Sequence, residues 1–97
     1  MNDLKYELND YIQALKTNLS VACMSFNVDI LEEETETVMK SFNDIYVKFH
    51  LGNYSELSTE VVNLYEYLNK TSDAFSYCLS LLEAIRIRIP ELEATVE

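Results

Sequence analysis

The chain of 97 residues has almost none of the residues that turn a backbone, with one Gly and one Pro. An all-β fold needs a turn about every 8 to 12 residues and draws many of those turns from Gly and Pro, so this scarcity excludes it. Long apolar runs are missing too, since none approaches the roughly 18 residues that a membrane helix requires. These absences favour a helical chain, for which we expect no membrane partner.

Basic residues are also scarce. Seven Lys and Arg stand against seventeen Asp and Glu, which gives a net charge of −10, and residues 17–39 and 49–69 contain no Lys or Arg. Such a surface repels the phosphate backbone of nucleic acids and anionic lipid, so direct nucleic-acid binding is disfavoured. What remains is a solvated surface or a basic protein partner.

The parts needed for catalysis are lacking. Ser or Cys nucleophiles usually depend on a positioned His, and the one His of the chain, His50, lies in a turn signal. The sequence also has no Gly-rich loop for phosphate and no Cys/His spacing for zinc. We therefore expect a protein that is not an enzyme and that holds no cofactor or metal.

Cysteine is limited to Cys23 and Cys78. The first seven residues have neither the basic nor the apolar segment of a secretory signal, so we expect a cytoplasmic protein with reduced thiols. Cys78 also falls within the apolar pattern of the second half, where a free Cys behaves as a small hydrophobic residue. Two buried thiols are therefore favoured over a disulfide.

What the chain does have is a regular apolar repeat. In the second half, apolar residues recur in steps of four and three, so that on a helix they form one narrow stripe that a partner helix must cover. This stripe consists of Leu57, Val61, Leu64, Leu68, Thr71, Phe75, Cys78, Leu82, Ile85, Ile89, Leu92 and Val96. Its continuity through Thr71 favours one helix over residues 55–96, although the polar residues 69–73 offer caps at which that helix can divide.

The first half carries two shorter stripes that are out of phase with each other. The first predicts a helix over residues 3–25 and consists of Leu4, Leu8, Tyr11, Leu15, Leu19, Ala22 and Phe26. The second consists of Leu31, Thr35, Val38, Phe42, Ile45 and Phe49. The change of phase predicts a kink or break near Asn27, with Asn27 as N-cap between an apolar pair formed by Phe26 and Leu31.

The strongest turn signal lies almost at the midpoint, in residues 50–53, which read His-Leu-Gly-Asn. Gly52 suits the left-handed position after a helix, and Asn53 can cap the next helix together with Glu56. Helices on either side of this turn fold back on each other. The expected fold is all-α in a single domain over residues 1–97, either an antiparallel helical hairpin or a compact four-helix bundle, as a monomer or a dimer.

Pro90 and the two arginines near the end of the chain add two expectations. Pro90 has no amide hydrogen for the carbonyl of Arg86, so the last helix should kink or end by Ile89. Arg86 and Arg88 form the one basic cluster and are candidates for pairing with the acidic residues 32–36. A calcium-type loop would need oxygen ligands around a Gly-bearing turn, so most of these acids are expected to face solvent.

In size, near-central glycine turn and helical-hairpin plan, the chain resembles the WXG100 class of small secreted helical proteins. The resemblance covers architecture alone. The chain has no Trp, and its turn reads His50-Leu51-Gly52. No Tyr-x-x-x-Asp/Glu follows the second helix, and Tyr6 with Asp10 matches that spacing only at the other end. We therefore do not assign the chain to the class.

These observations predict a small acidic helical protein that acts by protein-protein contact, as a regulator, inhibitor or adaptor. One alternative is a nucleic-acid mimic that occupies the basic groove of a DNA- or RNA-handling protein, and another is a secreted hairpin of the WXG100 type. If the stripes are filled within the chain, a partner must use residues beside them. The predicted contact residues are Glu32, Glu33, Glu34, Glu36, Glu60, Glu66 and Tyr67, of which Tyr67 is expected to be exposed.

Overall fold

The apolar stripes of the sequence lie on four α-helices. The computed structural model describes residues 3–24, 32–71 and 73–95, apart from the side chains of Met24 and Thr95. Its elements are α1 (Asp3–Met24), α2 (Glu32–Leu51), α3 (Tyr54–Thr71), the short 3-10 helix η1 (Asp73–Phe75) and α4 (Ser76–Thr95). The predicted N-cap Asn27, with Phe26 and Leu31, lies outside the described residues.

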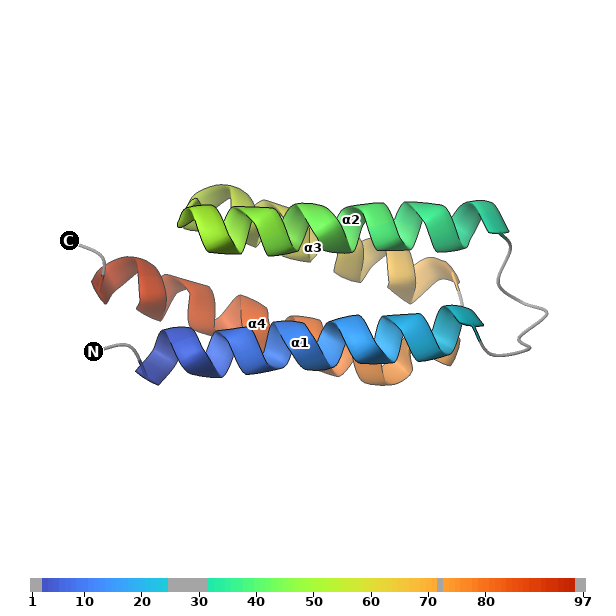
Figure 1. Ribbon diagram of the computed structural model, residues 1–97, viewed down its shortest axis with the longest axis horizontal. Helices are drawn as coiled ribbons and strands as arrows, with labels where there is room; N and C mark the ends of the chain where they lie inside the picture. Colours follow the sequence, from blue (N-terminus) through green and yellow to red (C-terminus); the bar gives the residue numbers. More distant parts are fainter. Residues whose placement is uncertain (1–2, 25–31, 72, 96–97) are drawn as a thin grey trace.

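The helices run alternately up and down along a bundle of 46 × 19 × 18 Å (Figure 1). In this arrangement α4 packs against both α1 and α3, and α2 packs against α3, while α1 and α2 share fewer contacts. The four-helix alternative is confirmed. The helical-hairpin alternative, and with it the plan shared with the WXG100 class, is wrong.

The prediction of one helix over residues 55–96 is wrong, because α3 ends at Thr71 and α4 begins only at Ser76, after η1. Hydroxyl groups on both sides of this interruption bond to the backbone. Thr71 Oγ1 donates to the carbonyl of Tyr67 at 2.7 Å, and Ser76 Oγ donates to the carbonyl of Asp73 at 2.7 Å. Such bonds compete with the helical backbone and favour its interruption. Phe75 in η1 is nevertheless completely buried, so the apolar spacing continues across the break.

The core is built mainly from the predicted stripes, joined by Tyr54 and Leu81. Every apolar stripe residue from Leu57 to Leu92 is buried, as are Val38, Phe42, Ile45 and Phe49. In α1, however, Ile12 is fully buried and Tyr11 only half-buried, so the placement of Tyr11 in the core was wrong. The Tyr11 ring instead lies beneath the Arg88 guanidinium, 5.0 Å from its centre, where α1 meets α4.

The midpoint turn forms as predicted. Gly52 has a φ of 74°, in the left-handed region. Its amide donates to the carbonyl of Phe49 at 3.1 Å, and the Asn53 amide donates to that of Lys48 at 3.0 Å, which together make a Schellman motif. Asn53 Oδ1 then accepts a long bond of 3.5 Å from the Glu56 amide at the start of α3.

Pro90 does not end the last helix, since α4 continues to Thr95. The prediction was that the helix would kink or end by Ile89, and of these two outcomes the ending does not occur. Pro90 lies on the exposed side of α4, where the carbonyl that it leaves unbonded can reach water, and Leu92 is buried beyond it.

The two arginines of α4 also differ from expectation. Arg86 pairs with Glu83 on its own helix at 2.7 Å, and Arg88 pairs with Glu7 of α1. Neither pair involves the acidic residues 32–36, and α4 makes no contact with α2 among the described residues, so the predicted pairing was wrong.

None of the described helices combines the length and the apolar composition needed to span a membrane.

Candidate functional site

Four of the residues predicted to bind a partner are acidic and lie at the start of α2. Glu32, Glu33 and Glu34 form its first turn, where carboxylates are stabilised by the positive end of the helix. Glu32, Glu33 and Glu36 are exposed, and Glu34 is half-buried. These acids therefore have a structural role in starting the helix whether or not they bind a partner.

Glu60 and Tyr67 lie together on the flank of α3 that faces α2. The flank is identified by Glu56, whose carboxylate pairs with Lys48 of α2 at 2.5 Å. That hydrogen bond raises the pKa of Lys48, and the nearby charge of Glu60 adds to it. Tyr67 was predicted to be exposed, but it is half-buried and packs against the core, because this flank is covered in part by α2.

Glu66 occupies a different surface from the other predicted residues. It lines a groove of about 510 Å³ between α3 and α4, and the other lining residues are Val62, Tyr65, Asn69, Glu83 and Arg86. The Arg86 guanidinium lowers the pKa of Glu83 in this groove through a hydrogen bond. Glu66 thus lies in the groove between α3 and α4, whereas Glu60 and Tyr67 lie on the flank that faces α2, so the seven predicted residues do not share one surface.

Exposed apolar side chains gather instead where α2 ends. Tyr46, Val47 and Leu51 of α2 are 37%, 41% and 73% exposed, and Tyr6 of α1 is 66% exposed. We call these four residues the turn-end surface. The buried stripe of α2 does not predict this surface. The signal for it is the spacing of Val47 and Leu51, which are four residues apart and lie on a second, outward face of the same helix.

Aromatic contacts tie this surface to the core. The Tyr46 and His50 rings lie 4.3 Å apart between centres, and His50 meets the edge of Phe49 at 5.3 Å. Phe49 in turn lies 6.5 Å from Tyr54 at the start of α3. Contacts of this kind hold exposed aromatic rings in place, which lowers the entropy lost when a partner binds.

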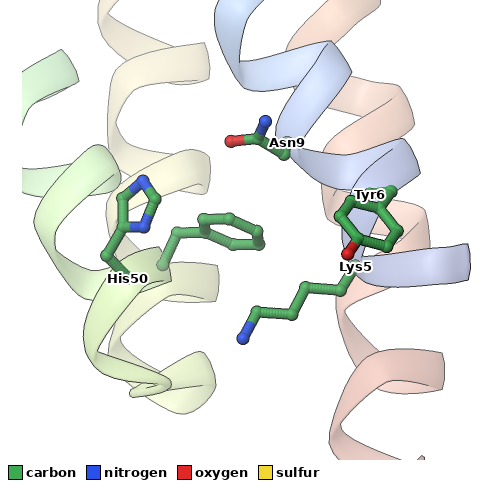
Figure 2. A pocket seen from close by; sticks show the side chains of 5 residues that line it. Lys5, Tyr6, Asn9 and His50 are labelled. Atoms are coloured by element: carbon green, nitrogen blue, oxygen red, sulfur yellow. The ribbon is translucent and has the colours of Figure 1, made fainter. Parts of the chain in front are cut away.

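A pocket of about 320 Å³ opens beside the turn-end surface, between α1 and α2. Figure 2 shows Lys5 and Asn9 reaching from α1 toward α2, with His50 on the facing wall and Tyr6 beside Lys5. Phe49 is the fifth described residue that lines the pocket. None of these five residues is acidic.

Neither a metal-binding cluster nor a thiol with a lowered pKa is found among the described residues. No group of three or more His, Cys, Asp or Glu side chains among them is placed to hold a metal ion. Burial raises the pKa of the Cys78 thiol to about 11, with a smaller contribution from Cys23, and burial also raises that of Cys23. Thiols with a raised pKa are poor nucleophiles near neutral pH.

Comparison with models of protein families, with curated proteins and with solved structures found no match. The candidate site therefore rests on the geometry of this chain alone.

Proposed function

We propose that this protein is a non-enzymatic helical module that acts by protein-protein contact, as a regulator, inhibitor or adaptor, and that it binds through the turn-end surface. The observation that carries the proposal is the division of apolar side chains between the buried core and the exposed surface. Most of the described apolar stripe residues of all four helices are buried inside the bundle, so a partner must bind what is left outside them.

The apolar side chains left outside are unevenly distributed. Four of the seven large apolar residues that are exposed in the described chain belong to the turn-end surface. Single exposed apolar residues are normal on protein surfaces, but clusters of them mark contact sites. Tyrosine is also enriched at interfaces, because its ring is apolar and its hydroxyl can bond to a partner or to water.

The test is partner capture by the immobilised protein, read by mass spectrometry. Replacing both Val47 and Leu51 by serine should abolish capture while the helical circular dichroism stays unchanged, because both side chains face solvent. Val21, which is 62% exposed on α1, gives the matched control: Val21→Ser should leave capture intact. Equal capture by all three proteins would show that the turn-end surface is not the contact site.

Nucleic-acid mimicry is the second candidate. It is favoured by the exposure of Glu32, Glu33 and Glu36, and by the ion pairs that tie Lys48 and Arg88 to carboxylates of the chain itself. Binding of a basic groove through these acids would weaken steeply with salt. Contact through the turn-end surface should persist at high salt, so capture at low and high salt separates the two candidates.

Self-association is a further proposal for the same surface. Light scattering on the wild-type protein at high concentration measures it directly. A dimer that dissociates in the Val47→Ser, Leu51→Ser variant would place the dimer contact on the turn-end surface, and a monomer at high concentration would remove the proposal. The predicted cytoplasmic location stays a prediction.

A further inference from the structure

We propose that the pocket between α1 and α2 binds a carboxylate carried on an aromatic or similarly flat apolar group. This inference deepens the proposed function, because the pocket adjoins the turn-end surface and would receive such a group from a partner. The same chemistry is also found in free small acids, and the experiment below separates the two sources.

Hydrogen-bond donors converge on this pocket from both helices. The Lys5 ammonium and the Asn9 amide come from α1, and the imidazole of His50 comes from α2 (Figure 2). The Tyr6 hydroxyl adds a fourth donor on the α1 side. A carboxylate accepts about four hydrogen bonds, and those from an ammonium group are among the strongest. The donor set therefore fits an anion.

The absence of acids in the lining supports an anionic ligand. Asp and Glu make up seventeen of the 97 residues, yet the five described residues that line the pocket include a Lys and a His and no acid. Glu7, which lies on α1 between Tyr6 and Leu8, pairs with Arg88 on the side facing α4. The groove between α3 and α4 gives the contrast, because it contains Glu66 and Glu83 beside its one Arg.

The size and walls of the pocket limit what the carboxylate can be attached to. About 320 Å³ is near the lower end of the range for small-molecule pockets, which suits one ring with its carboxylate. The rings of Phe49, His50 and Tyr6 line it, and aromatic walls favour a flat apolar group over a phosphate.

The test is a titration of the ¹⁵N-labelled full chain with N-acetylphenylalanine, in which amide chemical shifts report binding. Saturable shifts are expected at residues 5–9 and 49–50, and N-acetylphenylalanine amide, which lacks the carboxylate, should bind at least about tenfold more weakly. A short peptide with a C-terminal phenylalanine is the second arm. Tighter binding of the peptide than of the free acid assigns the pocket to a partner's C-terminus, and tighter binding of the acid assigns it to small molecules.

Two lysine variants control for net charge. Lys5→Ala should weaken binding of the acid about tenfold, because it removes the charged donor. Lys16→Ala, which removes an exposed lysine farther along α1, should leave binding unchanged. Absence of saturable shifts at millimolar acid, equal binding of the amide, or equal weakening by both variants would each overturn the proposal.

The pocket and the turn-end surface can fail separately. Val47 and Leu51 do not line the pocket, so replacing both by serine should abolish partner capture and leave binding of the free acid unchanged. If Lys5→Ala lost binding of the acid but still captured the partner, the pocket would bind the acid without taking part in partner binding.

Discussion

Replacing Gly52 by alanine isolates the energy of one backbone conformation. Gly52 has a φ of 74°, and a Cβ added to it would meet no atom within 4 Å. The substitution therefore creates no clash with the rest of the protein. Its cost comes from holding an L-residue in the left-handed region, which is about 1 to 2 kcal/mol. Gly52→Asn should cost less, because Asn adopts this conformation more readily.

The expected loss is large enough to measure. A domain of this size usually has a free energy of unfolding of about 5 to 15 kcal/mol, and a loss of 1 kcal/mol lowers the melting temperature by roughly 4 to 8 °C. Thermal unfolding followed by circular dichroism gives this shift. Urea unfolding should show a lower midpoint with an unchanged slope, since the exposed area on unfolding does not change.

Leu51→Ala provides the control. Leu51 is adjacent to Gly52 and 73% exposed, so its truncation should change the free energy of unfolding by no more than about 0.5 kcal/mol. If Gly52→Ala were as stable as this control, the left-handed conformation would not be what closes the turn. Gly52→Asn falling below Gly52→Ala would refute the same reasoning.

Further predictions concern the core, the start of α2 and the buried thiol. Leu64 is 1% exposed, so Leu64→Ala should lower the free energy of unfolding by about 2 to 5 kcal/mol in urea unfolding. Reversing Glu32 and Glu33 to lysine together should lower it by roughly 1 kcal/mol at low salt, because both lie in the first turn of α2; Glu36→Lys, beyond that turn, should be near neutral. Burial raises the pKa of Cys78 to about 11, so roughly one thiol in a thousand is ionised at pH 8. The reaction of Cys78 with a disulfide reagent should therefore be slow in the native state, become faster as the pH rises, and be fast in urea.

The buried residues could be predicted from the sequence because helical periodicity reports burial directly. The stripe Val38, Phe42, Ile45 and Phe49 is buried as predicted, and each step of three or four residues returns to the same side of a helix. Where two apolar residues are adjacent, as at Tyr11 and Ile12, both fit such a spacing. Packing against α4 decides between them, and the sequence pattern does not contain that contact.

The break between α3 and α4 could not be read from periodicity. Leu68 and Phe75 are seven residues apart, which is two turns of a continuous helix, yet Leu68 enters the core from α3 and Phe75 enters it from η1, which precedes α4. The better signal was the set of polar residues 69–73. The ion pairs were equally inaccessible, because Glu7 and Arg88 are 81 residues apart and meet only when α1 lies beside α4.

The candidate site depends on residues that contribute little to the bundle. Lys5, Asn9 and His50 lie where α1 faces α2, and these two helices share fewer contacts than the other neighbouring pairs. A flank that served stability alone would carry apolar side chains, which bury area at about 25 cal/mol per Å². Asn9→Leu should therefore raise the melting temperature and at the same time abolish binding of N-acetylphenylalanine, by removing a donor and filling the pocket. A variant that is more stable and still binds the acid would show that the pocket is a packing defect rather than a site.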